Sequence, residues 1–165
     1  MALRALPAVG WRERLALPDL GIYSISAKTD TGAHSSSIHA AKIEPYLKGG
    51  APWVCFVVHP RRRDAARAVE CHAPVAAHKA VRNSGGVARR RYFVETTFVI
   101  GSTAFTSALS LADRQQMGYR MLLGRVALRD RFSVDVGQSY VQGRPDRAAL
   151  TTREAPPSPS LRENP

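Results

Sequence analysis

The chain has 165 residues, of which 44% are hydrophobic and 22% are charged, a composition that suits one globular domain with a sizeable core. Lys and Arg total 24 against 13 Asp and Glu, so the net charge is +11; such a charge attracts acidic partners without choosing among nucleic acid, anionic lipid and acidic peptide. The first residues lack the apolar core of a secretory signal, and no apolar run reaches the roughly 18 residues of a membrane span. Cys55 and Cys71 are too few for a disulfide framework, so we expect buried free thiols in a cytoplasmic protein without a membrane partner.

Most of the chain is predicted to form short strands separated by turns, because runs rich in β-branched and aromatic residues alternate with Gly, Pro and Ser. Lys48-Gly49-Gly50 and Gly101-Ser102 are expected to close hairpins, and residues 124–131 to form a short helix. The pattern predicts a mainly β fold, closed or sandwich-like. The expected strands, in chain order, are 12–17, 23–28, 42–47, 52–58, 66–71, 92–100, 103–111, 120–123, 132–136 and 139–141.

A short polar turn, Asp30-Thr31-Gly32-Ala33, directly follows the alternating strand 23–28. In isolation such a turn is usually an Asx-type bend, in which the Asp side chain accepts backbone N–H bonds and Gly takes a positive φ. The alternative is that Asp30 is a catalytic carboxylate placed at the end of a strand. Much further along, Met121-Leu122-Leu123-Gly124-Arg125 combines bulky aliphatic residues with a glycine where the helix is expected to begin.

This pair of segments resembles the retropepsin-like aspartic peptidases, in which a D-T-G-A loop lies against an aliphatic-aliphatic-Gly segment before the single helix. The chain is more closely similar to a bacterial family of retropepsin-like endopeptidases, often labelled ATP-dependent zinc proteases and linked with ATP-grasp ligases that add glutamate tails to proteins. Further motifs shared with that family are Val9-Gly10-Trp11-Arg12-Glu13, Ile38-His39-Ala40, Arg82-Asn83-Ser84-Gly85-Gly86 and Met117-Gly118.

The resemblance implies a small closed β-barrel with one short helix and a flap hairpin. It assigns residues 1–8 to an N-terminal extension and residues 9–143 to the retropepsin-like domain, while the Pro- and Ser-rich residues 144–165 are expected to be a disordered tail. Asp30 is expected to be catalytic, with Thr31 bracing its loop and Gly32 allowing close backbone approach. Substrate-binding and loop-supporting roles are expected for Ala33, Arg82, Asn83, Ser84, Gly85, Gly86, Leu123, Gly124 and Arg125.

Peptide hydrolysis by such an enzyme needs two carboxylates that share one proton, since like charges about 3 Å apart cannot both ionise. The chain holds one D-T-G, and a further D-x-G, Asp135-Val136-Gly137, lacks the Thr and lies in the last expected strands. We therefore expect the second carboxylate to come from another copy of the chain, in a homodimer with a two-fold axis between the loops. The expected substrate is a peptide or protein, with acidic or Glu-rich segments favoured by the charge.

No metal or cofactor is expected, since the sequence contains neither H-E-x-x-H nor G-x-x-x-x-G-K-[ST] and its histidines are scattered. The arginine runs 61–63 and 89–91 could grip phosphates with Tyr92 and Phe93 stacking on bases, but a strand would send those two rings to opposite faces. A peptide partner is therefore preferred to nucleic acid. The alternative to a peptidase is a non-catalytic β-barrel module that binds acidic peptide or nucleic acid, and such a module should tolerate the loss of Asp30.

Overall fold

The structure is a computed structural model that describes residues 5–61, 66–83 and 85–151. Strands dominate it, which confirms the prediction of a mainly β fold. The strands are β1 (Ala8–Gly10), β2 (Arg12–Leu17), β3 (Ile22–Thr29), β4 (Ser36–His39), β5 (Ala41–Lys48), β6 (Ala51–Val58), β7 (Val69–Pro74), β8 (Ala77–Arg82), β9 (Ala88–Ile100), β10 (Thr103–Ala112), β11 (Met121–Leu123) and β12 (Ser133–Asp135). The helices are the 3-10 turn η1 (Pro18–Leu20), α1 (Arg125–Leu128) and α2 (Arg147–Leu150).

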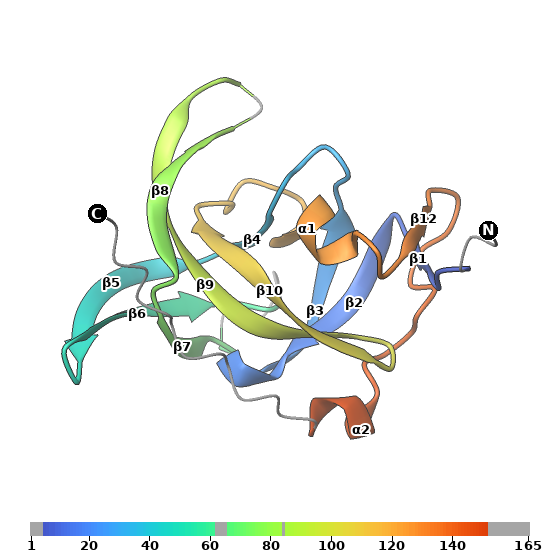
Figure 1. Cartoon of the computed structure of the whole chain (residues 1–165), viewed down its shortest axis with the longest axis horizontal. Coiled ribbons are helices and arrows are strands. Elements are labelled where there is room, and N and C mark those ends of the chain that lie inside the picture. Colours follow the sequence, from blue (N-terminus) through green and yellow to red (C-terminus); the bar gives the residue numbers. More distant parts are fainter. Residues whose placement is uncertain (1–4, 62–65, 84, 152–165) are drawn as a thin grey trace, which may run out of the picture.

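Six of these strands close into a barrel (Figure 1). β10 pairs with both β4 and β9, so the hydrogen-bonded order β10, β4, β11, β3, β2, β9 returns to the strand from which it began. Closure leaves no open sheet edge within this ring. Alternate residues of the strands fill the interior, and Leu15, Ile25, Phe98 and Leu109 are each at most 2% exposed. The predicted closed β-barrel is confirmed.

The short strand β11 lies between β3 and β4 and brings two distant segments together. It runs parallel to β3, with Leu123 opposite Thr29, and antiparallel to β4, with Met121 opposite Ile38. Met121 and Leu123 are fully buried, so this strand is fixed by its apolar side chains as well as by its ladder. The chain therefore leaves β3 and β11 at neighbouring points, one at Asp30 and the other at Gly124.

A second sheet, formed by β5, β6 and β7, flanks the barrel on the left of Figure 1. Buried residues recur at every second position of β6, as they do where one face of a sheet packs on a core. Val54, Phe56 and Val58 of β6 are fully buried and belong to the same core as the barrel residues. The predicted hairpin at Gly49 and Gly50 joins β5 to β6, and both glycines have a positive φ.

The strand predicted at residues 139–141 is wrong. Tyr140 has a φ of 56°, and isolated hydrogen bonds to β2, in place of a strand ladder, hold the segment. The Tyr140 N–H donates to the Arg12 carbonyl at 2.9 Å, and the Val141 N–H donates to the Glu13 carboxylate at 2.8 Å. The alternating Ser-Tyr-Val pattern could not distinguish such tethering from strand pairing.

The remaining differences concern the bounds of elements and strands that were not predicted. The strand expected at residues 66–71 starts later, at Val69, and the helix expected over residues 124–131 is a single turn. β4 was missed because all four of its residues are buried, so its sequence does not alternate. β8 was missed because it pairs only with β9 outside the barrel and none of its residues is buried, so its side chains do not alternate between a core and solvent.

Part of the predicted disordered tail is folded. Asp146 caps α2 by accepting the Ala148 N–H at 3.0 Å, and Ala149 packs against Ala16 and Val99 on the outside of the barrel. Residues 152–165 of the predicted tail and residues 1–4 of the predicted extension lie outside the described residues. Within the ranges that the structure describes, no helix is long and apolar enough to cross a membrane.

Candidate active site

Asp30 stands at the end of β3, where the chain turns out of the barrel. Its backbone N–H donates to the Leu123 carbonyl at 2.8 Å, which continues the β3–β11 ladder by one residue. Its carboxylate oxygen Oδ1 accepts the Gly32 N–H at 3.0 Å, and its carbonyl accepts the Ala33 N–H at 3.3 Å. Asp30 is half-buried, while Thr31 and Gly32 are exposed. The loop is thus an Asx-type turn that also presents an oriented carboxylate at the surface.

The segment after β11 supports this loop directly. The Arg125 and Val126 N–H groups, at the start of α1, donate to the Ala33 and His34 carbonyls at 2.9 and 3.0 Å. The Arg125 guanidinium donates to the Thr31 carbonyl at 3.0 Å. These contacts place the predicted supporting residues Leu123, Gly124 and Arg125 against the Asp30 loop.

Gly124 has no room for a side chain. A Cβ there would meet the backbone of Ser35, with the carbonyl oxygen of that residue only 2.6 Å away. The Gly124 N–H also donates to the buried Ser36 hydroxyl at 3.1 Å. The glycine is therefore required by the close approach of α1 to the chain that leaves the Asp30 loop.

Residues near the N-terminus form hydrogen bonds with the end of β3, next to Asp30. The Thr29 hydroxyl donates to the Gly10 carbonyl at 2.8 Å, and the Gly10 N–H donates to the Glu13 carboxylate at 2.8 Å. Glu13 is fully buried and also accepts the Val141 and Gln142 N–H groups. Glu13 belongs to one of the shared motifs, but the sequence pattern predicted no role for it. Thr29 was not predicted as a residue that supports the site either.

The predicted flap residues lie at the tip of the β8–β9 hairpin, which projects from the barrel (Figure 1). The Asn83 N–H donates to the Val87 carbonyl and the Gly86 N–H to the Asn83 carbonyl, each at 3.0 Å. Gly86 has a φ of 78°, which a residue with a side chain rarely adopts. Asn83, Gly85 and Gly86 are therefore together in one tight turn that follows Arg82, the last residue of β8, while Ser84 lies outside the described residues.

Arg91, Arg114 and Asp30 interact electrostatically. Burial lowers the pKa of Arg114, the neighbouring Arg91 lowers the pKa further, and the Asp30 carboxylate opposes both effects. Burial and then Arg89 lower the pKa of Arg91, on β9. Arg91 and Arg114 are both half-buried. Arg114 follows β10 and was missed as a site residue, since nothing in its local sequence shows that its loop reaches Asp30.

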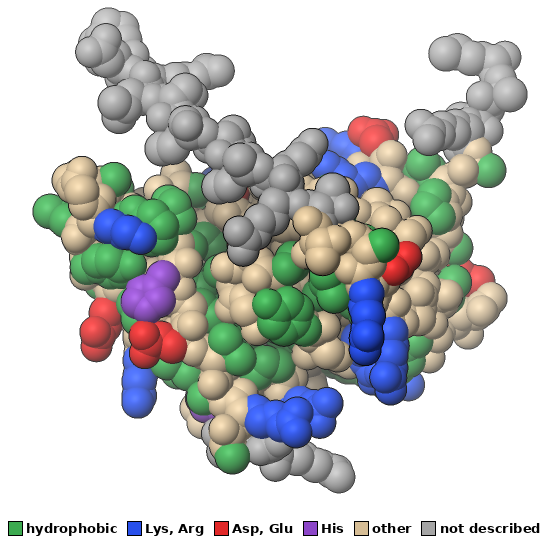
Figure 2. Space-filling view, turned by 90° about the horizontal axis from the view of Figure 1, so that it is seen from below, with side chains coloured by type: hydrophobic (Ala, Val, Ile, Leu, Met, Phe, Trp, Pro, Cys, Tyr) green, Lys and Arg blue, Asp and Glu red, His purple; other side chains and the backbone are tan. Residues whose placement is uncertain are grey.

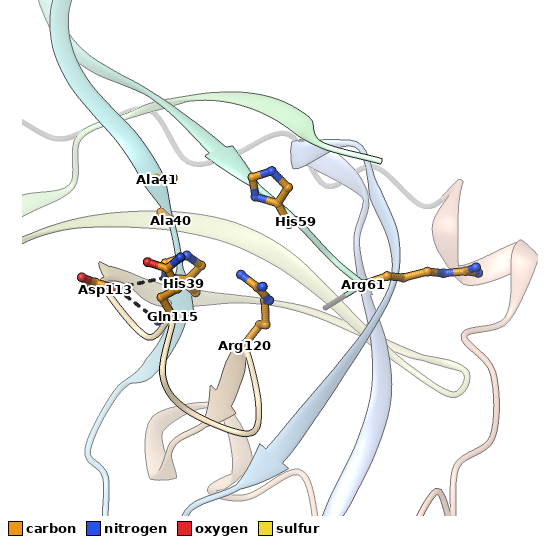
Figure 3. Close-up of a pocket in the computed structure, with 8 residues that line it drawn as sticks. All are labelled: His39, Ala40, Ala41, His59, Arg61, Asp113, Gln115 and Arg120. Atoms are coloured by element: carbon orange, nitrogen blue, oxygen red, sulfur yellow. Dashed lines mark hydrogen bonds and ion pairs between the residues drawn. The ribbon is translucent and has the colours of Figure 1, made fainter. Parts of the chain in front are cut away.

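A pocket of about 400 Å³, which Asp30 does not line, lies between β4, the end of β6 and the loop after β10. The Arg120 guanidinium points toward the imidazoles of His39 and His59, while Arg61 points away from them (Figure 3). His39 is 6% exposed, and its Nδ1 accepts the Arg114 N–H at 2.9 Å. Burial and then Arg120 lower the pKa of His39, and Asp113 opposes them. None of the predicted site residues lines this pocket.

Tyr92 and Phe93, the rings next to the second arginine run, do not form a stacking platform. Phe93 is buried, and Tyr92 stacks on His78 with ring centroids 4.0 Å apart. Arg62 and Arg63 of the first run lie outside the described residues. In the described parts of the chain one group of side chains has closely spaced metal-ligand atoms, Cys55, Glu70 and His72, and it lies on the second sheet.

Comparison with known families matches residues 8–145 to the family described as RimB-like, retropepsin-like aspartic endopeptidase RimB. A Shewanella pealeana protein named probable alpha-L-glutamate ligase is 37% identical over 135 residues, covering 82% of this chain and 30% of that protein. A Parasynechococcus marenigrum protein of the same name is 39% identical over 135 residues, covering 82% of this chain and 29% of that protein. The chain thus spans about 30% of the length of such relatives.

A crystal structure of a Legionella pneumophila protein of unknown function has a similar fold. The two chains are 27% identical and superpose with a TM-score of 0.69, covering 82% of this chain and 98% of that one.

Proposed function

The chain belongs to the RimB-like family of retropepsin-like aspartic endopeptidases, and we propose that it hydrolyses peptide bonds with a carboxylate dyad formed by Asp30 of two copies. The observation that carries the proposal is the Asp30 loop, in which a half-buried carboxylate is oriented by the Gly32 N–H at 3.0 Å. The β3–β11 ladder and the start of α1 hold that loop rigidly.

In the proposed reaction the two Asp30 carboxyl groups share one proton. The ionised carboxylate takes a proton from a water molecule, which attacks the peptide carbonyl, while the protonated partner donates its proton to the carbonyl oxygen. The tetrahedral intermediate then collapses as the leaving amine takes a proton from the dyad and one hydroxyl of the intermediate returns a proton to it, so the products are a carboxylic acid and an amine and the dyad regains its shared proton. Because the proton is shared, the two apparent pKa values belong to the pair.

A second copy is invoked because the other two D-x-G aspartates of the chain, Asp19 and Asp135, are engaged elsewhere. Asp19 accepts the Thr97 N–H at 3.1 Å and the Thr97 hydroxyl at 2.6 Å. Asp135 lies on β12, which pairs with β1 outside the barrel. Its two carboxylate oxygens accept the Gly137 N–H at 2.9 Å and the Gln138 side-chain amide at 3.0 Å. The exposed Thr31 and Gly32 leave the Asp30 loop open to a symmetry-related loop.

The proposed substrates are acidic or Glu-rich peptides. Arg91, on the hairpin strand, and Arg114, beside Asp30, are half-buried cations, and Arg91 lowers the pKa of Arg114. An anionic side chain between these two cations would relieve their repulsion. The relatives named probable alpha-L-glutamate ligases support this proposal. A domain similar to this chain forms part of each of them, and there it would be close to chains that carry glutamate.

The experiment is peptide cleavage by purified wild-type protein, by Asp30→Asn and by Asp135→Asn as the matched control. Asp30→Asn should lose cleavage while keeping its fold, because Asn is isosteric and its side-chain oxygen can still accept the Gly32 N–H. Asp135→Asn should cleave as the wild type does. Cleavage by Asp30→Asn would refute the mechanism, and peptide binding without cleavage by the wild type would favour the non-catalytic module.

A further inference from the structure

The outward face of the second sheet carries a cysteine, a histidine and a glutamate in adjacent positions. Cys55 on β6 is paired with His72 on β7, and Glu70 precedes His72 by two residues, which places its side chain on the same face. The neighbours Val54, Phe56 and Cys71 point the opposite way, into the core. In the view from below, a histidine lies beside acidic side chains on the side of the molecule where this sheet lies (Figure 2).

Their ligand atoms converge on one point. His72 Nε2 lies 2.9 Å from Glu70 Oε1 and 3.7 Å from Cys55 Sγ, and the three atoms all lie within 4.8 Å of one another. Tetrahedral Zn²⁺ bonds nitrogen and oxygen at about 2.0–2.2 Å and sulfur at about 2.3 Å, so its ligand atoms are roughly 3.3–3.7 Å apart. The cysteine and histidine already have this separation, and Glu70, whose side chain is 69% exposed, is free to move outward by a few tenths of an ångström.

A second layer of contacts orients the histidine. His72 Nδ1 lies 2.9 Å from the Tyr46 hydroxyl on β5. If the Nδ1 proton is donated to that hydroxyl oxygen, the lone pair of Nε2 faces Cys55 and Glu70, which is the tautomer that a metal requires. Partners of this kind on the far nitrogen accompany metal-bound histidines in proteins.

The surroundings of Cys55 are acidic. Glu44 on β5 is paired with Cys55 across the sheet, and the Glu70 carboxylate lies within 4.8 Å of the Cys55 sulfur. If the Cys55 thiol lost its proton there, three negative charges, the thiolate and the two carboxylates, would lie close together without a counter-charge. A divalent cation would supply the missing positive charge, and it would bind with release of the thiol proton.

We propose that Cys55, Glu70 and His72 form a binding site for a divalent transition-metal ion of the zinc type, with water in the remaining position. Zn²⁺ suits this mixed sulfur, nitrogen and oxygen set. The ion would tie β6 to β7 and, through Tyr46, to β5. The site lies on another sheet from the Asp30 loop and is independent of the proposed peptidase function.

The test is titration of the untagged, metal-free full chain with Zn²⁺, followed by calorimetry. We expect about one zinc per chain, with affinity that falls at least tenfold in Cys55→Ser and in His72→Ala, and roughly 10- to 100-fold in Tyr46→Phe. The matched controls are Cys71→Ala and His78→Ala, which keep the three ligands and should bind as the wild type does. With Co²⁺ in place of zinc, a thiolate-to-metal charge-transfer band should appear in the wild type and in Cys71→Ala, and be missing in Cys55→Ser.

A measurement on the wild type alone guards against variants that fail to fold. Zn²⁺ should slow alkylation of Cys55, measured by peptide mass spectrometry, and leave the slow alkylation of Cys71 unchanged. Cys71 is the internal reference because burial raises its pKa to about 12. Absence of stoichiometric zinc binding, undiminished binding by Cys55→Ser, or equal alkylation of Cys55 with and without zinc would overturn the proposal.

Discussion

Glu13 offers the sharpest test of how the Asp30 strand is supported. Its fully buried carboxylate accepts the Gly10 and Val141 N–H groups at 2.8 Å and the Gln142 N–H at 3.3–3.4 Å. Gly10 in turn accepts the Thr29 hydroxyl, so the carboxylate links the C-terminal segment to the residue before Asp30. The substitution Glu13→Gln keeps the size of the side chain and one acceptor oxygen. It replaces the other oxygen by an amide that faces a backbone N–H.

The expected loss in the free energy of unfolding follows from these contacts. A hydrogen bond to a charged group contributes about 1.5–3 kcal/mol. Glu13→Gln removes the shorter of the two contacts to the Gln142 N–H and weakens the bonds to Gly10 and Val141, because the remaining acceptor is uncharged. We therefore expect a loss of roughly 2–4 kcal/mol. Glu13→Ala would leave one buried donor, the Gly10 N–H, and two part-buried donors, the Val141 and Gln142 N–H groups, without their acceptor, at up to about 1–3 kcal/mol each. That sum approaches the roughly 5–15 kcal/mol that holds a typical domain. The glutamine variant is thus the measurable one.

The assay is equilibrium unfolding in urea, with Glu95→Gln as the control, because Glu95 is exposed on β9 and should change stability by less than about 0.5 kcal/mol. The denaturant slope should stay the same in all three proteins, so that the midpoints compare directly. A Glu13→Gln midpoint equal to that of the wild type would refute the bracing role of this carboxylate.

Two further predictions concern charge. Burial and Arg120 lower the pKa of His39 below the usual value of about 6.5. Because His39 is then protonated first in the unfolded chain as the pH falls, the free energy of unfolding should decline below about pH 6.5 toward the folded-state pKa. In His39→Asn, whose side-chain oxygen can accept the Arg114 N–H, urea unfolding should show a shallower decline with pH, and a decline parallel to that of the wild type would contradict this. For cleavage, kcat/KM on a Glu-rich peptide should fall as the Debye length shrinks from about 10 Å at 0.1 M salt to 3 Å at 1 M. The fall should be smaller in Arg114→Gln. An equal fall in kcat/KM for a neutral peptide would count against an acidic substrate.

Alternating strands and glycine turns were enough to predict a mainly β fold, closed or sandwich-like. The closed barrel and the contact between the segments at Asp30 and Gly124 were predicted from the family resemblance that those segments carry. β4, by contrast, is buried on both faces, and strands of this kind lose the alternation on which strand prediction depends. Asp146 caps α2, but a single helical turn is too short to show periodicity.

The parts of the site that depend on long-range contacts could not be predicted. Arg114 reaches Asp30 through a loop whose path is set by the barrel, and Glu13 gains its role from a C-terminal segment that lies more than a hundred residues away. The spacing between Cys55 and His72 in the sequence matches no metal-binding motif, and only the register of β6 on β7 brings the two residues together. Metal-site motifs are defined by local spacing, so they miss such a group.

The most direct test of the central claim is subunit mixing between the wild type and Asp30→Asn. The two proteins are unfolded together at equal concentrations, refolded, and assayed for peptide cleavage against wild-type protein alone at the same total chain concentration. If each active site needs Asp30 from both copies, random pairing leaves about one quarter of the dimers active, and the rate should fall to about one quarter. A rate near one half, expected if each chain acts alone, or near three quarters, expected if one Asp30 per dimer suffices, would contradict the shared dyad.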